Sequence, residues 1–333
     1  MNIQSCSLRD EVITAAALLR AGKTVAFPTE TVYGLGADAG NSTAVRRVFE
    51  IKGRPLGHPL IIHIAGAGDI ETWAKDVPDM AFRLAERFWP GPLTLVLRRK
   101  AWVPDLVTGA QDGVALRVPL HPVALALLRA FGGGVAAPSA NRFGGVSPTE
   151  ARHVFEELGG KVDLILDGGS CAIGIESTIL SLIETMPTIL RPGGLPVTAL
   201  TEAIGMQPAL ALSSGQSIRC PGMLPRHYAP RTMMEAEPSE AIWDRCCELE
   251  AAGERVGVLA LTDPLAQSAI QRQTTVVVVM PPDPPGYARR LYTALRRLDS
   301  EGLDRLLVER PPMNFEWLAV NDRLRRATQV WRE

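Results

Sequence analysis

Apolar and polar positions along the first 200 residues change repeatedly between a helical period and a strand period. Apolar residues three and four apart predict helices over residues 7–22, 42–53, 78–88, 121–131 and 147–160. Short apolar runs between them predict strands over residues 24–28, 59–65, 93–99, 114–119, 134–141, 162–169, 177–183 and 188–194. This alternation predicts an α/β domain, and strands that follow each other without a helix indicate a mixed sheet.

Two of these helices carry sequence signals for their first turn. Ser7 and Asp10 are spaced as a capping box at the start of the first helix. Ser147 and Glu150 have the same spacing at the start of the last one, with a proline between them at the first turn. We therefore expect Ser147 to be the N-cap of that helix.

The periodic pattern stops in the proline-rich residues 205–232, which predicts a semi-rigid linker. Beyond the linker, the pattern predicts strands over residues 254–262, 274–281 and 303–312 and an amphipathic helix over residues 285–302. The sequence thus predicts three parts: an N-terminal domain of residues 1–204, the linker, and a smaller α/β domain of residues 233–333.

The composition is that of a globular protein, with 46% hydrophobic and 21% charged residues among 333. A formal net charge of −1 gives no overall attraction to nucleic acid or membrane, so any anion site must be a local cluster. Five cysteines without a CxxC pair argue against a zinc site or a disulfide framework. The chain shows neither a signal peptide nor an apolar run of about 18 residues, so we expect a cytoplasmic protein without a membrane span.

Several familiar catalytic motifs are missing from the sequence. It has no GxxxxGK[ST] phosphate loop, no GxGxxG fingerprint, no HExxH and no GxSxG. Its five histidines do not show metal-ligand spacing, so no dedicated protein metal site is expected.

Polar residues gather instead at predicted strand ends, where open α/β sheets place their ligands. In residues 28–38, PTETVYGLGAD, we expect either a tight turn that needs Gly34 and Gly36 or a set of backbone and hydroxyl donors lining a site. Lys52 and Arg54 follow a predicted helix, and taken alone they favour a solvated helix end, where cations suit the helix dipole.

Further along, Ser139 and Asn141 offer small hydrogen-bonding groups where a strand passes into a loop. The helix start at Ser147 would suit a phosphate oxygen. Arg191 ends another predicted strand, where a lone arginine is usually solvated. Together these cations and small polar groups favour a polyanion site, with a nucleoside triphosphate as the expected occupant.

The Lys-x-Arg of Lys52 and Arg54, combined with the Ser-x-Asn of Ser139 and Asn141, resembles the signature of YrdC-type domains. The stretches PTETVYGLGADA, KGRP, PGPLTLVL, LRVP, APSAN, GIESTI and LRPG occur in that family's order. PGMLPRHYAPR and the second domain resemble the two-domain threonylcarbamoyl-AMP synthases. The resemblance covers nearly the whole chain. It implies a twisted open mixed sheet with helices in a YrdC-type catalytic domain, and a smaller Rossmann-like C-terminal domain.

The resemblance also implies a role for each matching residue. Lys52 and Arg54 are the implied catalytic residues, and both face the ATP phosphates. The other implied ATP-binding residues are His58, Ser139, Asn141, Ser147, Arg191 and Tyr228. The implied threonine-binding residues are Thr31, His63, Arg117, Ala137 and Ser177. Arg117 is the natural partner for the amino-acid carboxylate, and Tyr228 would fold with the linker over the nucleotide. Many members carry Asn where this chain has His58, and both side chains can form hydrogen bonds.

The implied reaction converts L-threonine, bicarbonate or CO2, and ATP into threonylcarbamoyl-AMP and pyrophosphate, which is the work of a nucleotidyltransferase. Mg²⁺ bound with ATP is the implied cofactor. The product serves threonylcarbamoyl modification of adenosine in tRNA, so the implied partners include the downstream tRNA threonylcarbamoyl transferase machinery and at most a weak contact with RNA.

Two alternatives come from other classes of function. A YrdC-type domain could act as an RNA-binding module, although near-neutral charge and few aromatic residues argue against this as the main role. It could also perform carbamoyl transfer inside a larger maturation enzyme, but the zinc-finger-like and acylphosphatase-like segments of such proteins are missing from this sequence.

Overall fold

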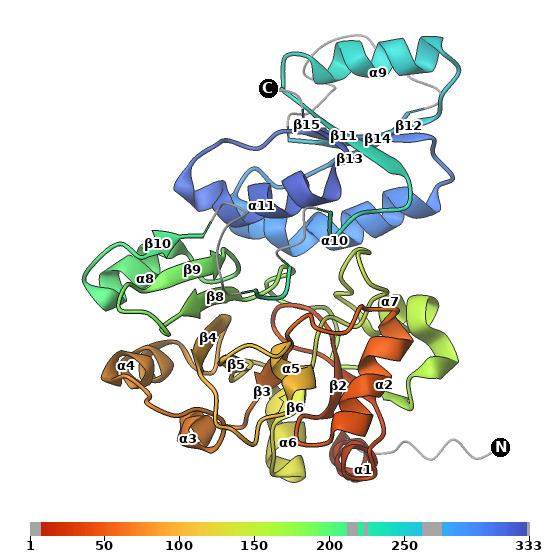
Figure 1. Cartoon of the computed structure of the whole chain (residues 1–333). Helices are drawn as coiled ribbons and strands as arrows, with labels where there is room; N and C mark the ends of the chain where they lie inside the picture. Colours follow the sequence, from red (N-terminus) through yellow and green to blue (C-terminus); the bar gives the residue numbers. More distant parts are fainter. Residues whose placement is uncertain (1–7, 212–218, 223–225, 262–274, 332–333) are drawn as a thin grey trace, which may run out of the picture. The chain divides into compact units, whose positions relative to one another are not determined.

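The computed structural model describes residues 8–211, 219–222, 226–261 and 275–331. The chain forms two compact units, one of residues 1–143 and 148–223, the other of residues 144–147 and 224–333 (Figure 1). The expected linker, residues 205–232, is divided between them at residue 223. The four residues 144–147 belong to the second unit although they lie in the middle of the first unit's sequence.

Within the described residues, the first unit builds a ten-stranded mixed sheet with the order β10-β9-β8-β4-β5-β3-β6-β2-β1-β7. Its parallel pairs are β1–β7, β3–β5, β4–β8 and β9–β10, and the remaining neighbours are antiparallel. The mixed α/β architecture expected from the sequence is therefore confirmed. The strands are β1 (Val25–Phe27), β2 (Gly34–Asp38), β3 (Ile61–His63), β4 (Leu93–Arg98), β5 (Gly113–Arg117), β6 (Val135–Ala136), β7 (Leu164–Ile165), β8 (Thr178–Ser181), β9 (Thr188–Arg191) and β10 (Ala209–Leu210).

Helices cover both faces of this sheet because its strands carry apolar residues on both sides. Val25 and Phe27 of β1 pack in one core with α1 and α6, and Ala26 between them packs in another core with α2 and α7. The helices of this unit are α1 (Leu8–Arg20), α2 (Ser42–Lys52), α3 (Ile70–Trp73), α4 (Asp79–Phe88), α5 (Asp105–Thr108), α6 (Pro122–Phe131), α7 (Ala151–Leu158) and α8 (Val197–Ile204), with short 3₁₀ helices η1 (Ala67–Asp69) and η2 (Gly159–Lys161).

The tight turn expected at Gly34 and Gly36 is wrong, because both residues lie in strand β2 between β1 and β6. The glycines serve close packing instead. A Cβ on Gly36 would lie 2.7 Å from Val135 Cγ1 and 2.8 Å from Phe27 Cε1. A larger residue would therefore push the neighbouring strands apart.

The helix start expected at Ser147 is also wrong, because α7 begins at Ala151 with Glu150 at the N-cap position. The preceding backbone is bonded elsewhere: the carbonyl of Pro148 accepts from the amide of Tyr33, and that of Thr149 accepts from the amide of Cys171. These two contacts join residues 148 and 149 to other segments, and α7 begins only after them. The capping box expected at Ser7 lies outside the described residues.

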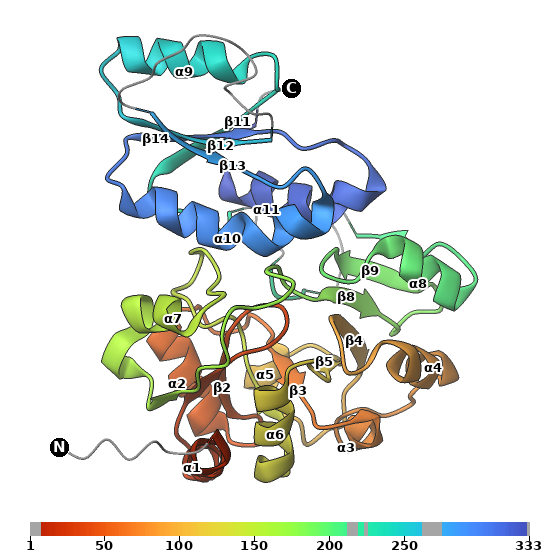
Figure 2. The ribbon, with the colours of Figure 1, turned by 180° about the vertical axis from the view of Figure 1, so that it is seen from behind.

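The second unit contains a sheet of five parallel strands within its described residues, in the order β13-β12-β14-β11-β15. Figures 1 and 2 show α9 on one face of this sheet and α10 and α11 on the other, a two-sided α/β arrangement. Its elements are β11 (Met233–Glu237), α9 (Ile242–Ala251), β12 (Val256–Ala260), β13 (Val276–Val279), α10 (Pro284–Ser300), β14 (Arg305–Glu309), η4 (Phe315–Trp317), α11 (Leu318–Ala327) and β15 (Val330–Trp331). In the part of the chain that the structure describes, no helix is long and apolar enough to cross a membrane.

Candidate active site

Polar side chains form a row across five neighbouring strands of the first unit. His63 at the end of β3 pairs in register with Arg117 at the end of β5. The antiparallel register of β4 with β5 brings Thr94 next to Arg117, and the Thr94 hydroxyl lies 2.8 Å from the hydroxyl of Ser177. Arg191 of β9 completes the row by binding Ser177. We call these residues the polar row.

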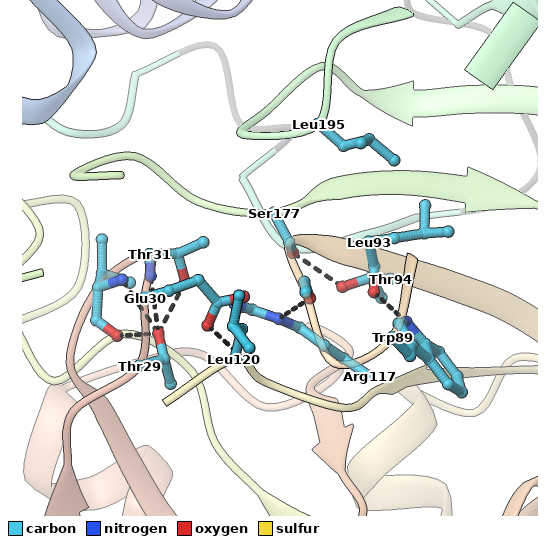
Figure 3. Close-up of polar contacts among 12 residues, drawn as sticks. Thr29, Glu30, Thr31, Trp89, Leu93, Thr94, Arg117, Leu120, Ser177 and Leu195 are labelled. Carbon is cyan, nitrogen blue, oxygen red and sulfur yellow. Dashed lines mark hydrogen bonds and ion pairs between the residues drawn. The ribbon is translucent and has the colours of Figure 1, made fainter. Parts of the chain in front are cut away.

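Arg117 is the central cation of the polar row and is almost completely buried. Its Nη2 lies 2.7 Å from Oε1 of Glu30, and each of these side chains is 4% exposed. Its Nε donates to the carbonyl of Gly91 at 3.3 Å, and Oε2 of Glu30 accepts from the amide of Leu120 at 3.0 Å. Figure 3 shows these contacts, which hold the guanidinium on two of its sides.

The turn before β2 carries Glu30 and is fixed by its own hydroxyl groups. The Thr29 hydroxyl donates to the carbonyl of Val32 at 2.6 Å and accepts from the amide of Thr31 at 3.2 Å. The hydroxyl oxygens of Thr29 and Thr31 lie 2.8 Å apart. All of these residues are buried, so the turn presents Thr31 and Glu30 in a fixed orientation.

Arg191 and Ser177 hold the other end of the polar row. The Arg191 guanidinium donates to the Ser177 carbonyl from Nε at 3.1 Å and from Nη2 at 2.9 Å, and its Nη1 donates to the carbonyl of Pro221 at 3.0 Å. Arg191 is only 3% exposed, so the solvated strand end that a lone arginine suggests is wrong here. A Cβ on Gly193 would lie 2.3 Å from the carbonyl oxygen of Glu176, so only glycine allows this close approach.

Lys52 forms a second cationic part of the site near the start of β3. Its ammonium group donates to the backbone carbonyls of Ser139 and Asn141, so the two motifs that suggested an anion site meet in the fold. Burial, and then the charge of Arg54, lower the pKa of Lys52 to about 7, while Glu157 opposes this shift. Lys52 is 3% exposed, which excludes the solvated helix end.

Arg54 and His58 meet around the ring of Phe143. The Arg54 guanidinium lies 5.6 Å from the centre of that ring and donates to the carbonyl of Pro59 at 3.1 Å. The imidazole of His58 lies 5.6 Å from the same ring, and burial, Arg54 and Arg219 lower its pKa. One buried cation, Arg54, and the imidazole of His58 therefore share one aromatic surface.

His63 and Ala137 connect the two cationic parts along β3. Burial, followed by the charge of Arg117, lowers the pKa of His63 to about 3, so its imidazole is neutral. Ala137 is buried, and its amide donates to the carbonyl of Ile61 at 2.9 Å. The Ser139 segment thus continues from β6 beside β3 toward Lys52.

The remaining two predicted residues, Ser147 and Tyr228, belong to the second unit. Ser147 is fully buried, and its carbonyl accepts from the guanidinium of Arg296 at 3.5 Å. Tyr228 is 1% exposed and stacks on Tyr292 with ring centres 5.8 Å apart, while the Arg323 guanidinium lies 5.1 Å from its ring centre. Its contact with a nucleotide stays a prediction.

Glu30, Thr94 and Phe143 are site residues that the sequence analysis did not single out. Only Glu30 carried a signal, since a lone carboxylate inside an apolar and hydroxyl-rich stretch needs a partner if it is buried. Thr94 and Phe143 take their places from strand register and loop packing. No cluster of three or more His, Cys, Asp or Glu side chains suited to a metal ion occurs among the described residues.

Comparisons with known proteins cover both units. The Sua5, YciO and YrdC family model, described as "Telomere recombination", matches residues 17–193. The model described as "Threonylcarbamoyl-AMP synthase, C-terminal domain" matches residues 195–329.

Similar proteins match over nearly their full length. A threonylcarbamoyl-AMP synthase of Pyrococcus abyssi (strain GE5 / Orsay) is 44% identical over 323 residues, covering 94% of this chain and 93% of the relative. The synthase of Bacillus subtilis (strain 168) is 40% identical and covers 95% and 92%. The crystal structure of P. abyssi Sua5 complexed with L-threonine matches with a TM-score of 0.88 at 41% identity, covering 97% of this chain and 96% of that one. This chain therefore belongs to the Sua5/YciO/YrdC family, in the two-domain form that carries the threonylcarbamoyl-AMP synthase C-terminal domain.

Proposed function

We propose that this protein is a nucleotidyltransferase that forms threonylcarbamoyl-AMP and pyrophosphate from L-threonine, bicarbonate or CO2, and ATP. The observation that carries the proposal is the separation of charge within the first unit. Arg117 is paired with Glu30 at one end of β3, whereas Lys52 and Arg54 stand next to each other at the other end. One end suits a single carboxylate and the other a polyphosphate. The full-length similarity to named synthases supports the same conclusion.

The chemistry asks the protein for positioning and charge neutralisation. The amine of threonine adds to CO2 and gives a carbamate, whose oxygen attacks the α-phosphorus of ATP while pyrophosphate leaves. No protein nucleophile is needed for these steps. Lys52, Arg54 and Arg191 would neutralise the phosphates, and Arg117 would hold the carboxylate of threonine.

Three further polar groups lie at the proposed threonine end. The neutral imidazole of His63 and the hydroxyls of Thr31 and Ser177 are buried hydrogen-bonding groups beside Arg117. Polar groups placed around the substrate side chain favour an amino acid with a hydroxyl over one without it. This suits threonine better than valine.

We further propose that Mg²⁺ enters with ATP. Magnesium is usually held by one or two carboxylates together with substrate phosphates and water, so it does not require a preassembled cage of protein ligands. When bound, the ion would share with Lys52 and Arg54 the neutralisation of the phosphate charge. We place the protein in the cytoplasm, where its product would pass to the machinery that modifies tRNA.

The direct test is pyrophosphate release by the purified protein with ATP, Mg²⁺, bicarbonate and L-threonine. We expect threonylcarbamoyl-AMP as the product, and no product without threonine, without bicarbonate or with excess chelator.

Arg54→Ala should lower kcat/KM for ATP at least about tenfold, a modest loss for a charged phosphate contact. Arg46→Ala, at an exposed position of α2, is the control. Pyrophosphate release that is indifferent to threonine would show that the proposal is wrong.

A further inference from the structure

Glu30 is a buried carboxylate whose contacts lie wholly inside the first unit. Oε1 pairs with Nη2 of Arg117 at 2.7 Å, and Oε2 accepts from the amide of Leu120 at 3.0 Å. Its backbone carbonyl accepts from the amide of Ile173 at 2.7 Å. Glu30 therefore ties the turn before β2 to the end of β5 and to the segment that precedes β8.

The same contacts determine which edge of Arg117 remains for a ligand. Nε is bound to Gly91 and Nη2 to Glu30. Among the described residues, the structure gives Nη1 of Arg117 no hydrogen-bond or ion-pair partner. Because the guanidinium is planar and rigid, fixing two of its nitrogens fixes the direction of the third.

Glu30 is also the charge that balances Arg117. His63 lies opposite Arg117 in the strand register and is neutral. Burial likewise raises the pKa of Cys171, whose thiol feels both Glu30 and Arg117, to about 12, so it too is neutral. Arg117 and Glu30 together form a pair without net charge, in contrast to the two neighbouring cations Lys52 and Arg54.

We propose that Glu30 is a positioning and specificity-determining residue for the amino acid. It aims Arg117 at the carboxylate of threonine and neutralises enough of its charge to keep phosphate groups away from this end of the site. ATP and threonine are both anionic at the groups the protein must hold. A pair without net charge at one end and the basic groups of Lys52 and Arg54 at the other would therefore direct each substrate to its place. This inference rests on the proposed function.

The test compares wild-type protein with Glu30→Gln and Glu30→Asp in steady-state synthesis, with inorganic phosphate as the competing anion. Glu30→Gln removes the charge. Its KM for threonine should rise about tenfold or more, whereas its KM for ATP should change less than about twofold. Phosphate should inhibit the variant competitively against threonine, at a concentration roughly tenfold lower than the wild type requires.

Glu30→Asp keeps the charge but shortens the side chain, so it separates the two effects. It should raise the KM for threonine while leaving phosphate inhibition at the wild-type level. Glu235→Gln is a matched control, because Glu235 is an equally buried carboxylate in the second unit, 3.1 Å from Arg245. It should lower the melting temperature without moving either KM.

Three results would overturn the inference: an unchanged KM for threonine in Glu30→Gln, an equal rise in both KM values, or phosphate inhibition that stays as weak as in the wild type. A failure of the proposed function looks different, since the wild-type protein would then show no threonine-dependent pyrophosphate release. Melting curves of all variants separate misfolding from a change at the site.

Discussion

Burial gives Lys52 a chemistry that an exposed lysine lacks. The cost of holding a charge away from water, together with the neighbouring charge of Arg54, brings its pKa down to about 7. Above that pH, much of the ligand-free protein carries a neutral amine at this position. A triphosphate beside it would favour the ammonium form and raise the pKa again, so ligand binding and protonation are coupled.

This coupling predicts proton uptake when ATP binds. At about pH 8 the Lys52 amine is mostly neutral in the ligand-free protein and protonated in the complex, so ATP binding should take up a substantial fraction of a proton. At about pH 6 the amine is charged in both states, so Lys52 should take up no proton on binding. Titration calorimetry in two buffers with different ionisation heats measures the difference. Lys52→Arg, whose side chain stays protonated, should lose the uptake at about pH 8. Equal uptake in both proteins would assign the proton to another group.

Residues of the site could be predicted from the sequence where the chain itself groups them. Lys52 and Arg54 stand two residues apart, as do Ser139 and Asn141, and the fold joins the two pairs through the carbonyls that accept from Lys52. Thr94 could not be found in this way, because its importance comes from the register that sets it beside Ser177, 83 residues away.

At the scale of elements, long amphipathic segments were predictable and glycine-containing strands were not. The pattern of α2 ends at Gly53, which adopts the left-handed conformation with φ 63° expected of a helix end. In β2 a glycine does not end the element: Gly36 lies inside the strand, and close neighbours leave no room for a side chain. Sequence alone does not distinguish a glycine needed for its backbone angles from one needed for its small size.

Helix α11 was not predicted from the sequence, because its polar residues, such as the buried Asn321 and Arg323, interrupt the apolar period.

The packing argument for β2 can be tested by Gly36→Ala. The added methyl group would overlap Val135 and Phe27 from the two neighbouring strands, so we expect a loss of about 1–3 kcal/mol in the free energy of unfolding, measured in urea. Gly40→Ala is the control, because the nearest atom to its new Cβ, Asp38 Oδ1, is 3.4 Å away. Equal losses for the two substitutions would contradict the packing argument.

On the scale of the whole molecule, the two units differ in how far the sequence could predict them. The N-terminal sheet was predictable as mixed, because consecutive strand patterns lack room for crossover helices. The second unit was predictable as α/β, but its first strand, β11, was not. Glu235 and Glu237 of β11 are buried, and two charged residues in a short segment do not give the apolar pattern of a core strand. Buried Glu235 is explained by Arg245 and Arg305, which come from later elements.

The full chain should be needed for activity. We expect a protein ending at residue 204 to stay soluble but lose most synthase activity and bind ATP more weakly, because it lacks Tyr228 and the surroundings of residues 144–147. In the full chain, Tyr228→Ala should reproduce part of the loss. Tyr228→Phe keeps the ring that stacks on Tyr292 and should retain the melting temperature, so it isolates the role of the hydroxyl. Measurements of kcat and ATP affinity decide the matter, and full activity in the truncated protein would contradict the prediction.

The tetrapeptide 144–147 has a consequence for how proteins of this kind can be recombined. Its carbonyls accept hydrogen bonds from the amide of Ala229 and the guanidinium of Arg296. The second unit is therefore complete only with four residues that the 76 residues 148–223 separate from its remainder in the sequence. A genetic crossover placed between the two units would transfer the C-terminal domain and leave this piece behind. The second unit is therefore inherited in two fragments, and a chimera of two relatives should take both fragments from the same parent.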